Sequence, residues 1–137
     1  MSASHPSERR QAHVARAQAA FEVVLRAAPE SHLWFLHAAL EKQQEARVIR
    51  GAWGGGGAVT CPLSALVLGR APKDEEQAGL AAIQSEDLLR AAGMHARDFT
   101  NAWDLGLIPA WRLLRRVDEE ITARTLGPRR ERARQRH

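Results

Sequence analysis

The sequence predicts an all-α fold, a compact single-domain bundle of five to six helices. Over most of the chain, apolar residues recur at spacings of three and four, which places them along one side of a helix. Prolines and glycines stand where these stretches begin and end, as they do at helix termini. No two neighbouring segments alternate apolar and polar residues as paired strands do. With 137 residues, 45% of them apolar and 26% charged, the chain has the size and composition of one globular domain.

The first half of the chain predicts two long helices. The first begins after Ser4 and Pro6, because a capping side chain and a proline are both favoured at a helix start. Its apolar stripe consists of Val14, Ala17, Phe21, Val24 and Ala28. Pro29 ends this helix and opens the next, whose buried side is expected to consist of Leu33, Leu36 and Leu40.

A glycine-rich loop is expected at about residues 50–58, after the helical pattern is lost from Ala46 onward. Four consecutive glycines cost conformational entropy in any regular element. A short helix follows this loop. We expect Thr60 to cap it, Pro62 to lie in its first turn and Gly69 to end it.

The second half of the chain predicts short helices separated by glycines. Asp74 can cap a weak helical segment, and Ser85 is expected to cap a separate helix that Gly93 ends. A further helix fits residues 96–105 and stops at Gly106. Its buried residues are expected to be Phe99, Ala102 and Trp103.

The C-terminal part of the chain predicts a last helix from Pro109, in which Arg116 and the other charged residues face water. The inner side of this helix is expected to consist of Trp111, Leu114, Val117 and Ile121. Residues 124–137 hold six arginines and one acidic residue, whereas the whole chain has a net charge of +4. We therefore expect a single, nearly neutral helical domain over residues 1–124 and a basic, disordered tail over residues 125–137. Two interpretations of the tail stay open, a nucleic-acid-binding arm and a solvated chain end.

Residues 85–106 predict a helix-turn-helix-like unit, made of two short helices joined by a glycine turn. The spacing of its apolar and glycine residues is similar to the DNA-reading end of MerR-type transcription regulators; the residues concerned are Leu88, Ala92, Gly93, Met94, Phe99, Gly106, Leu107, Ile108 and Pro109. In that family the helix after the turn enters the major groove. The resemblance therefore implies nucleic-acid contacts for His95, Arg97, Thr100 and Asn101, with Arg112 near phosphate, and we add Arg115, which lies beside it.

The unit also differs from that family. It is internal and leads directly into a helix, and Asn101 and Ala102 stand where paired tyrosines are typical. Asp98 places a negative charge on the helix expected to read DNA, and this charge repels backbone phosphates.

No constellation of catalytic or metal-binding residues stands out, so we predict a protein without enzymatic activity, cofactor or metal. Cys61 begins a helix, where a thiolate is stabilised, but neither a nearby histidine nor a second cysteine accompanies it. We therefore interpret Cys61 as a small packed residue. The glycine run lacks the lysine and hydroxyl residue of a phosphate-binding loop. His32 and His37 are five residues apart, whereas zinc-binding helices use a spacing of four.

We therefore expect a small helical binding protein. Nucleic-acid binding through the helix-turn-helix-like unit is one hypothesis. The alternative is a protein–protein interaction or homodimerisation module, motivated by the tryptophans Trp34, Trp53, Trp103 and Trp111. A homodimer through the second and last helices is the favoured form of this alternative. The simpler interpretation is that all four tryptophans belong to the core.

The sequence also predicts a cytoplasmic protein without a membrane partner. Its N-terminal part lacks the apolar segment of a secretory signal peptide, and no apolar run is long enough to cross a bilayer. A single cysteine agrees with a reducing compartment.

Overall fold

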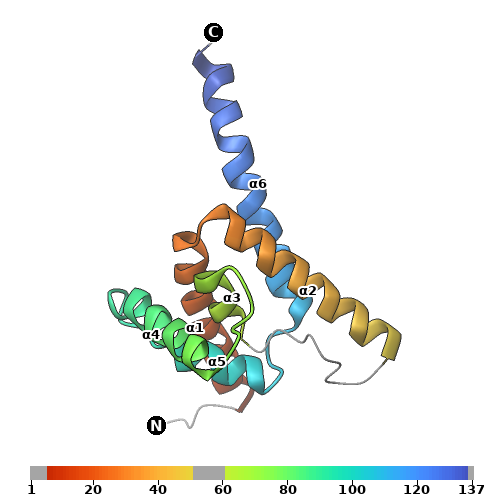
Figure 1. Cartoon of the computed structure of the whole chain (residues 1–137), viewed down its shortest axis with the longest axis vertical. Helices are drawn as coiled ribbons and strands as arrows, with labels where there is room; N and C mark the ends of the chain where they lie inside the picture. The colour runs from red at the N-terminus through yellow and green to blue at the C-terminus, as the bar shows by residue number, and fades with distance from the viewer. Residues whose placement is uncertain (1–5, 51–60, 136–137) are drawn as a thin grey trace.

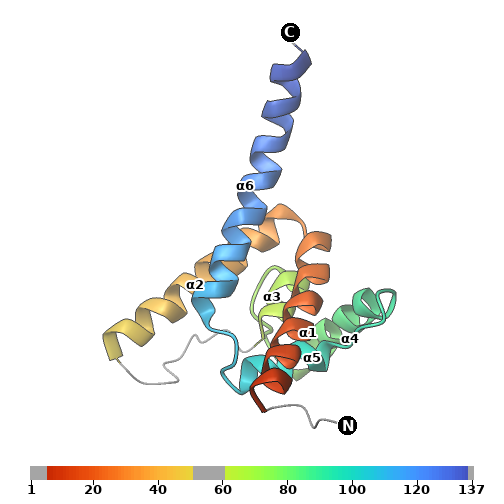
Figure 2. The ribbon, with the colours of Figure 1, turned by 180° about the vertical axis from the view of Figure 1, so that it is seen from behind.

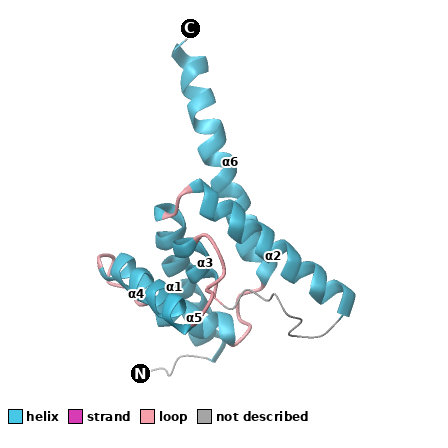
Figure 3. Ribbon diagram, in the orientation of Figure 1, coloured by secondary structure: helices cyan, strands magenta, loops and turns pink. Residues whose placement is uncertain are grey.

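Six α-helices make up the part of the chain that this computed structural model describes, residues 6–50 and 61–135 (Figures 1 and 3). They are α1 (Pro6–Ala27), α2 (Glu30–Arg50), α3 (Pro62–Leu68), α4 (Glu75–Arg90), α5 (Ala96–Asp104) and α6 (Ala110–Gln135). No strand occurs within these two ranges, and the all-α prediction is confirmed. The glycine-rich loop expected at about residues 50–58 lies, apart from Arg50, outside the described residues.

The first helix, α1, is the central element of the fold. It packs against α3, α4 and α5, and α3 in turn contacts both α4 and α2. Figures 1 and 2 show α2 and α6 crossing on one side of the molecule, with α3, α4 and α5 gathered on the other. The same views show the C-terminal part of α6 extending beyond the other helices.

The buried residues of α1 and α2 follow the predicted helical stripes. Phe21 of α1 is 2% exposed, and Leu33, Leu36 and Leu40 of α2 are fully buried. The ring of Phe21 stacks on the ring of Phe99 from α5, with 5.5 Å between their centroids. Aromatic pairs of this kind stabilise a fold beyond the effect of area burial. The pair therefore joins the first helix of the chain to the fifth.

Several predicted helix ends are confirmed. Pro29 lies between α1 and α2. The side chain of Asp74 accepts a hydrogen bond from the backbone N–H of Gln77 at 2.8 Å and so caps α4. Positive φ angles of 70° to 72° occur at the three predicted glycines, Gly69, Gly93 and Gly106. Glycine adopts this left-handed conformation without the steric cost that other residues incur.

Two predictions beside the glycine-rich loop are wrong. α2 continues to Arg50, although we expected its pattern to end at Ala46. The glutamate, alanine and arginine residues of this segment are strong helix formers, which favours continuation of the helix. The N-cap of α3 is Cys61 and not Thr60, which lies outside the described residues. Pro62 starts the helix, because its fixed φ suits the first helical position.

Ser85 does not cap a separate helix, contrary to the prediction. α4 runs unbroken from Glu75 to Arg90, and Ser85 is buried within it. The serine hydroxyl donates to the backbone oxygen of Ala81, one turn earlier, at 2.8 Å. A serine whose hydroxyl bonds in this way fits inside a helix, so its capping tendency is not used.

The inner side of α6 is rotated from the predicted one. Its buried residues are Ala110, Leu113, Val117 and Ile121. Trp111, expected inside, is 48% exposed. The adjacent Leu113 and Leu114 allow two neighbouring apolar stripes, and packing against α2 selects the stripe through Leu113. α6 extends to Gln135.

Arg124 fastens α6 to the C-terminal end of α1. Its guanidinium donates to the backbone oxygens of Ala28 at 2.7 Å, Leu25 at 3.1 Å and Arg26 at 3.2 Å. The last carbonyls of a helix have no partner within that helix. Arg124 therefore supplies donors that α1 lacks, and its positive charge suits the negative end of the helix dipole.

Arg116, which we expected to face water, lies part-buried between Glu22 of α1 and Glu120 of α6. Its Nε donates to Glu22 at 2.8 Å, and its Nη2 donates both to Glu22 and, at 3.0 Å, to Glu120. Glu120 also accepts a hydrogen bond from Arg124 at 3.2 Å. The hydrogen bonds with Glu22 raise the pKa of Arg116. Burial alone would raise the pKa of Glu22, but hydrogen bonds and charges of Arg116 and Arg26 lower it overall.

His32 of α2 packs over the C-terminal end of α3. Its Nδ1–H donates to the backbone oxygen of Leu66 at 2.6 Å, because a carbonyl can only accept. Gly69 lies directly beside the imidazole. A Cβ atom on Gly69 would lie 2.4 Å from Cδ2 of His32. Both the positive φ of Gly69 and the histidine ring therefore require a glycine here.

Replacing Gly69 by alanine should destabilise the fold by about 2 kcal/mol or more. A left-handed residue with a side chain costs about 1–2 kcal/mol, and displacing His32 removes a hydrogen bond worth about 1 kcal/mol. Urea denaturation followed by circular dichroism measures the change. The control is Gly93→Ala, because Gly93 has φ +72° but no atom within 4 Å of the added Cβ. This control should lose only about 1 kcal/mol, and equal losses in both variants would contradict the role of His32.

Replacing Glu22 by glutamine should lower stability by about 1 kcal/mol at neutral pH and have little effect in acid. The folded chain lowers the pKa of Glu22 from 4.5, so its contribution is complete above that value and is lost as the pH falls through the folded pKa. Denaturant titrations across this pH range measure the difference from the wild type.

The control for this variant is Glu119→Gln. Glu119 makes an exposed ion pair with Arg115 at 3.4 Å, so its loss should change stability by less than about 0.5 kcal/mol at any pH. A loss in Glu22→Gln that does not depend on pH would exclude the proposed charge effect.

Candidate interaction surfaces

The predicted helix-turn-helix-like unit corresponds to α4, a tight turn and α5. At the end of α4 the backbone N–H of Met94 donates to the carbonyl of Leu89 at 3.0 Å, with Gly93 in the left-handed conformation between them. The carboxylate of Glu86 in α4 then accepts the N–H of Ala96 at 2.8 Å and so caps α5. These contacts hold α5 in a fixed orientation relative to α4.

Three of the four residues predicted to contact nucleic acid on this unit are exposed, namely His95, Arg97 and Asn101. Thr100 is half-buried, and its hydroxyl donates to the backbone oxygen of Ala96 at 3.0 Å. Arg97 and Asn101 are four residues apart and therefore share a face of the helix. Arg97 and Asn101 thus form a short polar row that α5 presents to solvent.

Acidic side chains lie beside this polar row. Asp104 is exposed and lies seven residues after Arg97, on the same face of α5. Nδ1 of His95 is 3.8 Å from a carboxylate oxygen of Glu86. Arg97 itself has no acidic partner among the described residues. The row therefore offers one unpaired cation and lacks the uniformly positive surface typical of phosphate binding.

The other two predicted contacts, Arg112 and Arg115, lie on α6, which packs against α2. The guanidinium carbon of Arg112 is 5.5 Å from the ring centre of Trp111, a cation–π distance. Arg115 pairs with Glu119 at 3.4 Å. Arg112 and Arg115 therefore each contact another residue of α6. Among the described residues, neither forms a hydrogen bond or an ion pair with the polar row of α5.

The two helices that we favoured for a homodimer, α2 and α6, form a surface with two exposed tryptophans. Trp34 of α2 is 52% exposed and Trp111 of α6 is 48% exposed. Helical spacing places Trp34 on the same face as His37, and Trp111 on the same face as Asp118. Nε2 of His37 lies 2.6 Å from Oδ1 of Asp118 and so joins the two faces. We call the surface formed by these four residues the tryptophan face.

His37 lies at the centre of the tryptophan face. Its Nδ1 is 3.0 Å from a carboxylate oxygen of Glu41, while its Nε2 contacts Asp118. The ring centre of Trp34 is 5.5 Å from that of His37. Because the side chain of His37 is only 15% exposed, it gives Trp34 a fixed support.

The interpretation that all four tryptophans belong to the core is wrong for Trp34 and Trp111. Trp103 is half-buried and its ring stacks on that of Phe99, with 6.2 Å between centroids. Trp53 lies outside the described residues. In the structure, each exposed tryptophan directly follows a buried residue, Leu33 before Trp34 and Ala110 before Trp111. The sequence pattern of α6 gave no signal for the exposure of Trp111, because Trp111 fits one of its two apolar stripes.

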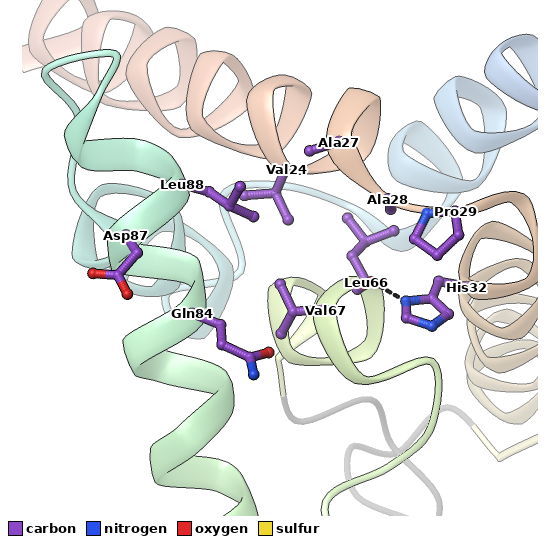
Figure 4. Close-up of a pocket in the computed structure, with 10 residues that line it drawn as sticks. All are labelled: Val24, Ala27, Ala28, Pro29, His32, Leu66, Val67, Gln84, Asp87 and Leu88. Carbon is purple, nitrogen blue, oxygen red and sulfur yellow. Dashed lines mark hydrogen bonds between the residues drawn. The ribbon is translucent and has the colours of Figure 1, made fainter.

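A hollow of about 330 Å³ opens between α1, α3 and α4 (Figure 4). It is lined by Val24, Ala27, Ala28, Pro29, His32, Leu66, Val67, Gln84, Asp87 and Leu88. No sequence motif indicates this hollow, because its residues come from several separate segments of the chain.

Cys61 begins α3 as a free, half-buried thiol that packs against the core. Elsewhere, His32 is bonded to a backbone carbonyl and His37 to carboxylates, so these two rings do not converge. Within the part of the chain that the structure describes, no three histidine, cysteine or acidic side chains are grouped as metal ligands would be.

The chain matches no protein-family model, and no curated protein or solved structure is significantly similar to it. No helix in residues 6–50 or 61–135 is both long enough and apolar enough to span a membrane.

Proposed function

We propose that this chain is a non-enzymatic cytoplasmic binding protein that acts through the tryptophan face, and that its partner there is a second copy of the chain. The main support is that Trp34 and Trp111 are both about half exposed on this one face. Tryptophan is enriched among the residues that dominate binding energy at interfaces. A single exposed apolar residue is ordinary, but two large ones on one rigid face favour a binding role.

The arrangement of side chains on the face favours a second copy as the partner. α2 and α6 run in roughly opposite directions (Figure 1), and His37 of α2 contacts Asp118 of α6. Because Trp34 precedes His37 while Trp111 and Arg115 precede Asp118, Trp34 lies on one side of this contact and the other two residues lie on the opposite side. A two-fold axis through the centre of the face brings Trp34 of each copy against Arg115 and Trp111 of the other. Arginine stacks favourably on tryptophan, and Arg112 already makes this contact with Trp111.

The wild-type chain should therefore dimerise, and Trp34→Gln and Trp111→Gln should each weaken the dimer by about 30-fold. This factor corresponds to the loss of about 2 kcal/mol that is typical of a dominant interface residue. Sedimentation equilibrium over a series of protein concentrations measures the dissociation constant.

The matched control is Leu105→Gln. Leu105 is 69% exposed after the end of α5 and lies outside the tryptophan face, so its replacement should leave association unchanged. Thermal unfolding verifies that each variant is folded. A wild-type chain that stays monomeric at the highest attainable concentration rules out the homodimer.

Nucleic-acid binding through α5 is a second candidate function. It is favoured by Arg97, which is exposed, has no acidic partner among the described residues, and lies on a helix that Glu86 caps. The resemblance to MerR-type regulators implies that such a helix enters the major groove. Asp104 on the same row opposes this function, because it repels phosphates.

Under this second candidate, Arg97→Ala should weaken binding to duplex DNA by about 1–3 kcal/mol. The exposed Arg70 in the loop before α4 provides the control, since Arg70→Ala should have no effect. Fluorescence anisotropy measures the affinity, which should fall steeply as the salt concentration rises. If deletion of residues 125–137 abolishes binding while Arg97→Ala leaves it intact, the contact lies on the basic end of the chain and not on α5.

A further inference from the structure

We propose that the hollow between α1, α3 and α4 binds a small uncharged apolar ligand that carries one hydrogen-bonding group. Its volume of about 330 Å³ lies at the lower end of the range typical of small-molecule sites. The hollow shares no residue with the tryptophan face. The inference is therefore independent of the proposed homodimer and of nucleic-acid binding through α5.

Most of the residues that line the hollow are apolar, and the main walls come from α1, α3 and α4. Leu66 of α3 is fully buried and Val24 of α1 is 1% exposed, so both are fixed by the core. Val67 of α3 points into the space between α3 and α4 (Figure 4). Leu88 of α4 stands at the rim and is 38% exposed. A ligand that covers Leu88 removes apolar surface from water, which favours binding.

Gln84 supplies the polar contact of the site. Its side chain extends from α4 toward Val67 (Figure 4), and its amide has no hydrogen-bond partner among the described residues. An amide both donates and accepts, so it can pair with a hydroxyl, an amine or a carbonyl group. On the opposite wall His32 is held by its hydrogen bond to Leu66 and keeps that side of the hollow in place.

The charges around the hollow favour an uncharged ligand. Asp87 is the only acidic residue of the lining, and no lysine or arginine belongs to it. In Figure 4 the carboxylate of Asp87 turns away from Val67, and it lies 3.5 Å from Arg90. An ionised ligand would lose water in the hollow without gaining an opposite charge.

The test compares three probes of the same shape on the full chain. 2-Naphthol is uncharged and carries one hydroxyl, naphthalene lacks the hydroxyl, and 2-naphthoate replaces it with a charge. Titration of the ¹⁵N-labelled chain followed by NMR should show saturable binding of 2-naphthol to one site, with shifts of the backbone signals of the lining residues. 2-Naphthoate should bind at least about tenfold more weakly.

Two variants assign the binding to the hollow. Val67→Phe fills the space and should weaken 2-naphthol binding by about tenfold or more. Gln84→Leu should weaken 2-naphthol binding by about fivefold, the equivalent of one neutral hydrogen bond, and leave naphthalene binding unchanged. The matched control is Ile83→Phe, because Ile83 is 59% exposed on α4 and does not line the hollow. This control should change neither affinity.

Each alternative result overturns part of the proposal. Signal shifts that do not saturate mean that the probe adheres non-specifically to exposed apolar residues of α4. An equal loss of 2-naphthol affinity in Val67→Phe and Ile83→Phe means the same, and in either case the hollow is not a binding site. Equal binding of 2-naphthoate and 2-naphthol excludes an uncharged ligand class. If Val67→Phe does not fold, Leu88→Gln at the rim takes its place, and an unchanged affinity in that variant also overturns the site.

Discussion

The C-terminal end of α1 leaves backbone carbonyls that no residue of α1 can satisfy, and Arg124 of α6 donates to three residues there. Arg116 strengthens this junction through Glu22, where the part-buried charges are matched. Removing one partner of such a pair leaves the other charge part-buried without compensation, which costs more stability than replacing both residues. The two helices are therefore held in the orientation that keeps the pair intact. With α6 fixed to α1 in this way, α2 packs along α6, and the side chains of the tryptophan face come together.

The helices and most of the core were predictable because their signals are local. The stripe of α2 needs only the spacing of Leu33, Leu36 and Leu40, and the left-handed glycines need only their place after a helix. The errors arose where partners distant in sequence decide the outcome. Arg116 was expected in water because Glu22, its main partner, lies 94 residues earlier in the chain. No periodicity within α6 contains that information.

The candidate surfaces were predictable to different degrees. The exposure of Arg97 and Asn101 follows from the apolar stripe of α5, which leaves the opposite face to solvent. Trp34 and Trp111 were harder, because tryptophan is apolar and a helical pattern does not separate a core position from its neighbour. The hollow could not be predicted at all, since its walls meet only when α1, α3 and α4 have packed.

The path of α6 has a mechanical consequence. The helix continues past Arg124 to Gln135 and leaves the other helices behind (Figure 1). Arg124 is thus the point at which α6 is attached to the end of α1, and the part of α6 that follows it projects from the rest of the molecule. Arg124 donates a hydrogen bond to the backbone oxygen of Ala28, and Ala28 also lines the hollow. One hydrogen bond therefore connects α6 directly to a residue that lines the hollow, although Arg124 and Ala28 are 96 residues apart along the chain.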